Sequence, residues 1–188
     1  SDFKRAYIKM RGAEYENKES LYLHHLSDEK GYTCGGIYQS ANPNALDWDF
    51  IDRICKVTGD IKRASVMIYN DKKIELQIFA YFKKHYWDVS RLDEIQHQKV
   101  AEEIFMASVL YHPTRAVKMA QKIAGTKEDG HLGSFSVKGI NNVELKYFDD
   151  LYDVLENQLA ETIAKKHHKE HYLNGWKNRA NDSWDIKV

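Results

Sequence analysis

Apolar side chains recur at helical spacing at the start of the chain. Phe3, Tyr7 and Met10 fall on one stripe of residues 3–13. A period of three to four residues predicts an amphipathic helix. Glycine is a poor helix former, so we expect the helix to run out near Gly12.

The next segment, residues 15–38, has no helical period. It is rich in polar side chains and contains Gly31, Gly35 and Gly36. Glycine adopts the positive φ angles that tight turns require. We therefore expect an irregular loop or a short hairpin here.

Helical spacing returns after this loop and continues through most of the remaining chain. The expected helices are one that begins at Asn42-Pro43 and ends at Gly59, one over 71–86, one over 98–110, one from Pro113 to Gly125, and a long one that is capped by Asn142 and carries Phe148 to Ile163. Turn-forming residues at 127–133 mark the internal boundary that we expect. The pattern predicts a mainly α protein with roughly seven helices around one core.

Length and composition narrow the class of protein. The chain has 188 residues, 30% of them charged, with a formal net charge of zero, which predicts one domain or one domain with an appended subdomain. A neutral chain lacks the basic footprint of a nucleic-acid binder. No apolar run reaches the ~20 residues of a membrane helix, and we expect neither membrane insertion nor a signal peptide. Cys34 and Cys55 form no CxxC pair; their spacing favours two reduced thiols and leaves a single bridge open.

Candidate chemistry lies near the first helix and the loop that follows it. Glu14 stands between Ala13 and Tyr15, and such neighbours disfavour a charged carboxyl, which suits a general acid. Asp28 and Thr33 lie within the loop. A carboxylate and a hydroxyl placed opposite the acid could hold and activate a water molecule. The same spacing also fits ordinary solvated residues.

Other candidates carry weaker signals. His167 and His171 stand four residues apart, a spacing that zinc sites use, but the surrounding lysines favour a solvated cationic helix end. Aromatic rings can stack on the apolar faces of sugars. We expect Tyr38 and Tyr111 to serve a sugar cleft, and either His24 or His25 to reach a substrate or to lie on the surface.

A series of short motifs resembles glycoside hydrolase family 108, bacterial and phage lysozymes joined to a C-terminal peptidoglycan-domain segment. In chain order the motifs are Glu14, the block Gly31-Tyr32-Thr33-Cys34-Gly35-Gly36-Ile37, Tyr86-Trp87-Asp88 with Leu92-Asp93, Ala116 through Gln121 to Gly125, Asp129-Gly130-His131-Leu132-Gly133, and Gly175-Trp176-Lys177-Asn178-Arg179. Their order and spacing cover nearly the whole chain.

This sequence departs from the family pattern at the start. The family motif His-Glu-Gly-Gly-Tyr is replaced by Arg11-Gly12-Ala13-Glu14-Tyr15. An ungapped alignment would put Gly12 at the position of the acid, whereas the register that we prefer puts Glu14 there. The second carboxylate is Asp28 by its distance to Thr33, with Glu29 as the alternative.

The resemblance implies a lysozyme-like helical fold, with residues 1–125 as the catalytic part and 126–188 as the C-terminal segment packed on it. It implies an N-acetylmuramidase that cleaves the β-1,4 bond between N-acetylmuramic acid and N-acetylglucosamine. Glu14, Asp28 and Thr33 would be catalytic, and Tyr38, His24 and Tyr111 would bind the substrate. The expected partner is the peptidoglycan glycan strand, acted on by a monomer without metal or cofactor.

The sequence is also compatible with two other functions. Gly12 at the nominal acid position favours an inactive lysozyme-fold module, which would bind peptidoglycan or form part of a phage or secretion assembly. A zinc peptidase on the His167–His171 segment is a weaker alternative. For the enzyme we expect synthesis in the cytoplasm and action on the bacterial cell wall, either in phage lysis or in wall remodelling.

Overall fold

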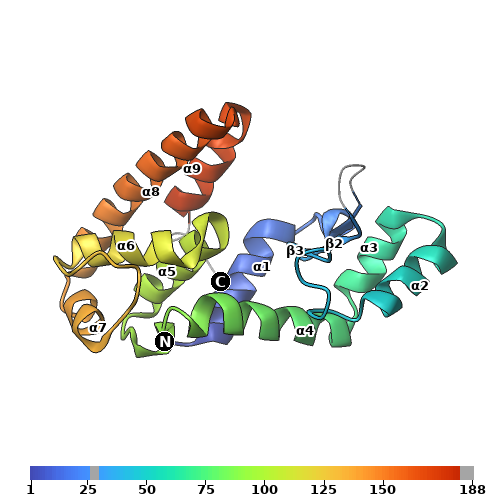
Figure 1. The fold of residues 1–188 in the computed structure, drawn as a ribbon, viewed down its shortest axis with the longest axis horizontal. Coiled ribbons are helices and arrows are strands. Elements are labelled where there is room, and N and C mark those ends of the chain that lie inside the picture. Colours follow the sequence, from blue (N-terminus) through green and yellow to red (C-terminus); the bar gives the residue numbers. More distant parts are fainter. Residues whose placement is uncertain (26–29, 183–188) are drawn as a thin grey trace. The chain divides into compact units, whose positions relative to one another are not determined.

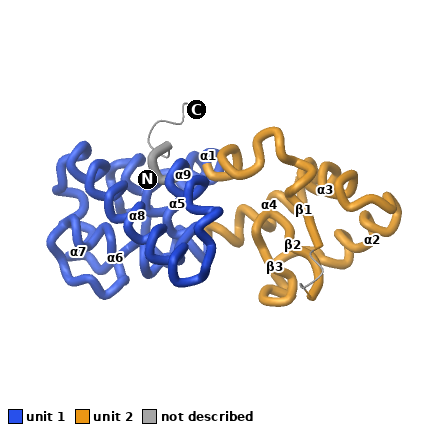
Figure 2. The backbone as a smooth tube through the Cα atoms, turned by 90° about the horizontal axis from the view of Figure 1, so that it is seen from above, with its two compact units in different colours: residues 1–9, 84–188 blue, residues 10–83 orange. Residues whose placement is uncertain are grey.

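The computed structural model describes residues 1–25 and 30–182, and it confirms the mainly α fold (Figure 1). The chain forms two compact units rather than the single core that we expected (Figure 2). Unit 1 combines residues 1–9 with 84–188, and unit 2 consists of residues 10–83. The functional division expected at residue 125 is a different boundary and stays a prediction.

Unit 2 begins within the first helix and holds the small sheet. Its elements are the end of α1 (Phe3–Tyr15), η1 (Glu19–Leu21), β1 (Leu23–His24), β2 (Thr33–Cys34), β3 (Ile37–Tyr38), α2 (Trp48–Thr58), α3 (Ile61–Tyr69) and α4 (Lys72–Phe82). The strands form an antiparallel sheet in the order β1-β2-β3. The expected loop with a hairpin is therefore present, whereas the short helix α3 had no counterpart in the sequence prediction.

Three aspartates determine where the helices of unit 2 start. The carboxylates of Asp47, Asp60 and Asp71 accept hydrogen bonds from backbone N–H groups in the first turns of α2, α3 and α4. Such caps satisfy donors that have no partner within the helix. The expected start at Asn42-Pro43 was wrong, because that segment forms turns and Asp47 supplies the cap. The expected end was right: Gly59 closes α2 with a φ of 63°.

Unit 1 is built around one buried helix. Its elements are the start of α1, η2 (Lys83–Asp88), η3 (Leu92–Glu94), α5 (Gln98–Tyr111), α6 (Pro113–Ile123), α7 (Ser134–Asn141), α8 (Leu145–His167), η4 (Glu170–Tyr172) and α9 (Leu173–Asp182). Every residue of α5 from Val100 to Ser108 is buried, so the helix is covered on all sides. Among the described residues no helix is long and apolar enough to cross a membrane.

Two of the short motifs have structural roles in unit 1. Trp87 is fully buried, and its indole N–H donates to Asp93 at 2.7 Å. The side-chain amide of Gln121 bonds the Asp129 carboxylate at 2.9 Å, and its oxygen accepts from the Gly130 backbone N–H at 2.9 Å. The two bonds of the Gln121 side chain hold the turn at 127–133, which was predicted as turn-forming.

His167 and His171 were assumed from the sequence to lie on one helix. The structure places them in two different elements. The helix α8 ends at His167, and His168 follows with a φ of 53°. His171 lies in η4. The exposed end of α8 carries Lys165, Lys166 and His167 in its last turn, where cations are favoured by the helix dipole.

Buried carboxyl groups are a second feature of unit 1. Glu102 is 2% exposed and lies 3.1 Å from the ammonium group of Lys9, so its charge is balanced. Glu156 on α8 is also 2% exposed. Burial and the nearby Asp153 raise the pKa of Glu156 from 4.5 to about 8. A carboxyl with a raised pKa is neutral near pH 7, which avoids the cost of a buried charge.

We expect Glu156→Gln to change how stability depends on pH. Between pH 4.5 and about 8 the folded protein keeps the Glu156 proton and the unfolded chain loses it, so the free energy of unfolding falls as the pH rises. The fall should end above about pH 8 and amount to a few kcal/mol, on the order of what ionising a buried group costs. Glutamine should remove it.

Urea unfolding of both proteins from pH 5 to pH 9 measures this difference. Glu128→Gln, an exposed change in the same unit, is the matched control and should leave the profile unchanged. Parallel profiles for the wild type and Glu156→Gln would contradict the prediction.

Candidate active site

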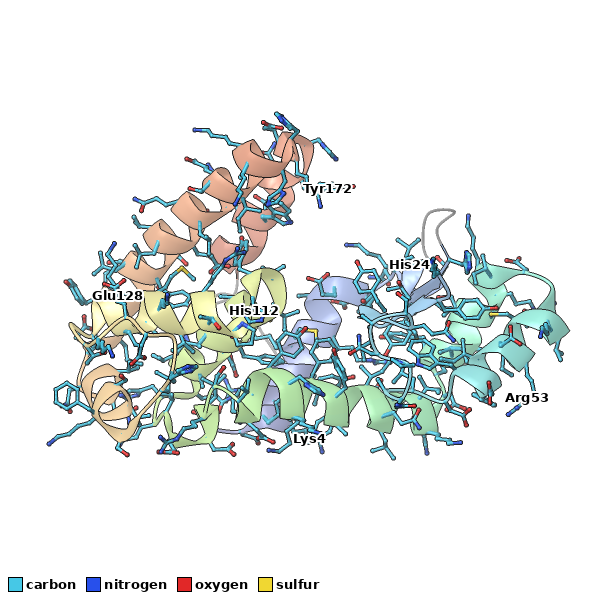
Figure 3. The ribbon with its side chains drawn as sticks, in the orientation of Figure 1. Lys4, His24, Arg53, His112, Glu128 and Tyr172 are labelled. Carbon is cyan, nitrogen blue, oxygen red and sulfur yellow. The ribbon has the colours of Figure 1, made fainter. Side chains whose placement is uncertain are left out.

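The small sheet of unit 2 brings three predicted site residues into one row. His24 on β1 pairs with Thr33 on β2, and Thr33 pairs with Tyr38 on β3. Directly opposed residues on neighbouring strands point to the same face, with Cβ atoms about 4.5–5.5 Å apart. The row therefore places an imidazole (His24 is labelled in Figure 3), a hydroxyl and a phenol side by side.

The other face of the sheet belongs to the core. Leu23, Cys34 and Ile37 form the second row, and each is at most 1% exposed. In the row that contains the site residues, Thr33 is 2% exposed and Tyr38 is 52% exposed. The sheet thus buries one face and opens the other toward solvent at Tyr38.

A two-glycine turn sets the register of this row. Gly35 and Gly36 connect β2 to β3 with φ angles of 53° and 81°. Two-residue hairpins of this kind need positive φ at both positions. A Cβ atom on Gly35 would lie 2.8 Å from the Ile78 Cδ1 atom and 3.1 Å from the Tyr22 ring. Glycine is therefore required at Gly35 by both its backbone angle and its neighbours.

Aromatic contacts connect the end of α1 to the sheet. Tyr15 is the last residue of α1, and its ring meets that of Tyr22 edge-on at 4.8 Å. Tyr22 precedes β1, and its carbonyl accepts from the Gly35 N–H at 2.8 Å. Glu14, the residue before Tyr15, is therefore carried on a helix end that packs against the root of the hairpin.

Arg11, one helical turn before Glu14, anchors the same end of α1. Its Nε lies 2.9 Å from Glu75 Oε2, an ion pair rather than a directed hydrogen bond. Its Nη2 donates to the Tyr69 carbonyl at 2.7 Å, and the guanidinium carbon lies 3.8 Å from the centre of the Tyr69 ring. Burial by itself would lower the pKa of Arg11, but Glu75 and the phenols of Tyr22 and Tyr69 outweigh it and raise that pKa. The charged guanidinium thus fixes α1 to both α3 and α4.

Tyr32 fixes the start of β2. Its hydroxyl donates to Asp52 on α2 at 3.1 Å, and its backbone N–H donates to the Gln39 side chain at 2.9 Å. Burial, together with bonds to Cys55 and Asp52, raises the pKa of the Tyr32 phenol, so the group stays a donor. Thr33, the next residue, is held in place by these contacts of its neighbour.

The remaining predicted site residues are distributed as follows. Glu14 lies in unit 2 and is partly exposed. Asp28 and its alternative Glu29 lie outside the described residues. Tyr111 belongs to unit 1, where it is 4% exposed. The structure therefore assembles His24, Thr33 and Tyr38 on one sheet, and carries Glu14 in the same unit.

The residues that hold the end of α1 in place were not predicted from the sequence. Arg11 was considered only as part of a motif register, although its spacing of three from Glu14 puts the two residues on one helix face. Glu75 and Tyr69 gave no local signal, because their role depends on how α3 and α4 pack. Within the described part of the chain, no three His, Cys, Asp or Glu side chains are grouped as metal ligands would be, and both cysteines are free thiols.

The chain is similar in sequence to a known family and in fold to a solved structure. The model of the family described as Glycosyl hydrolase 108 matches residues 14–111, about half of the chain. No curated protein matches the chain. The structure of SagA from Brucella abortus is similar, with a TM-score of 0.57 and 17% sequence identity over 98% of this chain and 97% of that one. At this identity the likeness shows a shared fold.

We expect Gly35→Ala to disturb the hairpin more than Gly59→Ala. Both glycines have a positive φ, which costs alanine about 1–2 kcal/mol. A Cβ on Gly59 meets nothing within 4 Å, whereas one on Gly35 meets the buried Ile78 at 2.8 Å, and overpacking of this kind adds about 1–3 kcal/mol. Urea unfolding of the two variants measures the difference, and equal losses of stability would refute the steric argument.

Proposed function

The chain belongs to the glycosyl hydrolase 108 family, and on that premise we propose that it is a lysozyme-type hydrolase of peptidoglycan. The bond cleaved is the β-1,4 link from N-acetylmuramic acid to N-acetylglucosamine. Its place of action is then the bacterial cell wall.

The strongest support for this proposal is the row of polar residues on the sheet of unit 2. The row of His24, Thr33 and Tyr38 lies on a hairpin whose root packs against the helix end that bears Glu14. The segment matched by the family model begins at Glu14 and contains the whole row. A carboxyl, a hydroxyl and polar rings within one unit are groups that glycoside hydrolysis uses.

Glu14 is the general acid of this mechanism. Its proton moves to the glycosidic oxygen as the bond from that oxygen to the anomeric carbon breaks, and the N-acetylglucosamine residue leaves with a free hydroxyl. Tyr15, Arg11 and their partners restrict the helix end that carries the acid. Positioning of this kind lowers the entropic part of the barrier.

A water molecule completes the reaction. It adds to the anomeric carbon and gives a proton to the second carboxylate, Asp28 or Glu29, while the Thr33 hydroxyl bonds it and sets its direction. The ring of Tyr38, half exposed beside Thr33, can stack on a sugar face. His24, on the other side of Thr33, supplies a hydrogen-bonding group for the sugar hydroxyls.

The inactive module stays the second candidate, because of the surroundings of Gly12. A Cβ atom at Gly12 would meet no other atom within 4 Å, so a larger side chain has room there. If the family acid aligns with this position, the chain lacks it. The family match covers residues 14–111, so it contains Glu14 and not Gly12.

We expect Glu14→Gln to lower hydrolysis of purified peptidoglycan by about 10²–10⁴-fold while the fold stays intact. Glutamine keeps the shape and hydrogen bonds of the side chain but cannot donate a transferable proton, and general acid catalysis is worth about this much. The measurement is release of new reducing ends, identified by mass as N-acetylmuramic acid. Glu16→Gln, an exposed change of the same charge two residues away, is the matched control.

The same assay separates the two candidates. Full activity in Glu14→Gln would show that another residue is the acid. An inactive wild type that becomes active as Gly12→Glu would establish the degenerate site instead. New ends of N-acetylglucosamine, or cut peptides, would refute the bond that we propose.

We expect Thr33→Val to slow hydrolysis on the order of 10-fold, well short of the loss in Glu14→Gln, because the water keeps its carboxylate base. Valine preserves the branched shape that suits a strand and removes only the hydroxyl. Thr33→Ser retains the hydroxyl and should stay near the wild-type rate. The turnover numbers of the three proteins at saturating peptidoglycan test this, and a slow Thr33→Ser with a normal Thr33→Val would reverse the interpretation.

A further inference from the structure

Unit 1 contains a pocket of about 330 Å³ where α5 ends and α6 begins. Three aromatic residues from distant parts of the sequence line it: Tyr86, Tyr111 and Trp176. Tyr111 and Trp176 meet edge-on at 6.5 Å. A volume of this size fits a single sugar or a similar small molecule, and aromatic walls suit the apolar face of a sugar ring.

The polar side chains of the pocket give it a positive charge. Arg115 and His112 line it, and no acidic residue does among those whose side chains the structure describes. The exposed Arg115 reaches the Tyr111 carbonyl at 3.4 Å, and it has no carboxylate partner among residues 1–25 and 30–178. A guanidinium offers five N–H donors and no acceptor. Most of its donors are therefore available to a ligand.

His112, the residue between α5 and α6 (labelled in Figure 3), adds a second donor. Its Nδ1 accepts from the Thr114 N–H at 3.4 Å, so in the neutral ring the Nε2 atom carries the hydrogen. The backbone of His112 has a φ of 88° and a ψ of 139°, a conformation that costs a non-glycine residue about 1–3 kcal/mol. Strain of this kind is often kept where a side chain has a task.

We propose that this pocket binds a sugar that bears a free carboxylate, with the ring against Tyr111 and Trp176 and the carboxylate on Arg115 and His112. Arginine is suited to carboxylates because its planar fork can donate two parallel hydrogen bonds. The 11-residue helix α6 begins at Pro113, and its positive end adds to the attraction for an anion. The choice of a wall sugar rests on the proposed function, whereas the carboxylate chemistry rests on the pocket alone.

N-acetylmuramic acid with an unsubstituted lactyl group is the wall sugar of this class. N-acetylglucosamine has the same ring without the lactyl carboxylate, and the carboxamide of N-acetylmuramic acid keeps the size without the charge. In peptidoglycan the lactyl group is normally joined to a peptide. The pocket would therefore select glycan strands from which the peptides have been removed.

The test is a titration of the full-length Glu14→Gln protein with these three probes, followed through the indole N–H resonance of Trp176. The chain has four tryptophans, and a Trp176→Phe variant assigns the resonance. We expect N-acetylmuramic acid to bind at least about 10-fold more tightly than either neutral probe, since a pocket with unpaired donors rejects a ligand that cannot use them.

Two variants and a control locate the binding group. Arg115→Gln should weaken the affinity for N-acetylmuramic acid by about 10- to 100-fold, the range expected for a charge-assisted bond. His112→Asn should weaken it less, because the asparagine amide keeps a hydrogen-bond donor. Lys122→Gln, the same change of charge at an exposed position of α6 outside the pocket, should have no effect.

Three results would overturn the proposal: no shift with N-acetylmuramic acid, equal binding of all three probes, or unchanged affinity in Arg115→Gln. Hydrolysis by the wild type is measured separately. If the pocket fails these tests while the wild type still releases reducing ends, only this inference is lost. If binding occurs as expected but no hydrolysis is found, the pocket stands and the proposed activity does not.

Discussion

The positive φ angles of Gly35 and Gly36 are the constraint on which the candidate site depends. Because the turn has only two residues, it pairs Cys34 with Ile37, and this forces Thr33 opposite Tyr38. A slip of one residue would exchange the two faces of the sheet and move the site row into the core. The strands are only two residues long, so the turn, and not the length of the ladder, holds this register.

A second constraint acts at the end of α1. The side chains of the Arg11–Glu75 pair are 22% and 31% exposed, so water screens it and the Coulomb energy alone is modest. The contact of the guanidinium with the Tyr69 ring and its bond to the Tyr69 carbonyl act in the same place. Together they specify the position of the helix end more than they stabilise the fold, and position is what a general acid needs.

Long elements with a clear period could be predicted from the sequence, and short ones could not. The stripes of α1 and α5 and the proline that opens α6 gave the right boundaries to within two residues. The helices α3 and α7 have nine and eight residues, too few turns for their pattern to stand out. Asn142 resembled a cap, but the Glu144 carboxylate takes the N–H groups of Lys146 and Tyr147 instead.

The division into two units could not be predicted, because it depends on contacts between distant parts of the chain. Unit 1 joins residues 1–9 to 84–188, and the aromatic cluster of Phe3, Trp87 and Phe105, with ring centres 5.4–5.8 Å apart, is part of its core. Each of these rings reads from the sequence as an ordinary apolar position. Their spacing along the chain carries no information about which rings meet.

The same reason explains which functional residues the sequence revealed. Thr33 and Tyr38 flank a local glycine motif, so a short stretch of sequence was enough to propose both. Arg115 is one exposed cation among several on α6, and nothing adjacent to it marks it. It becomes distinctive only because Tyr86 and Trp176, 29 residues before it and 61 after it in the chain, line the same pocket. A site that is assembled by packing in this way can be found only once the fold is known.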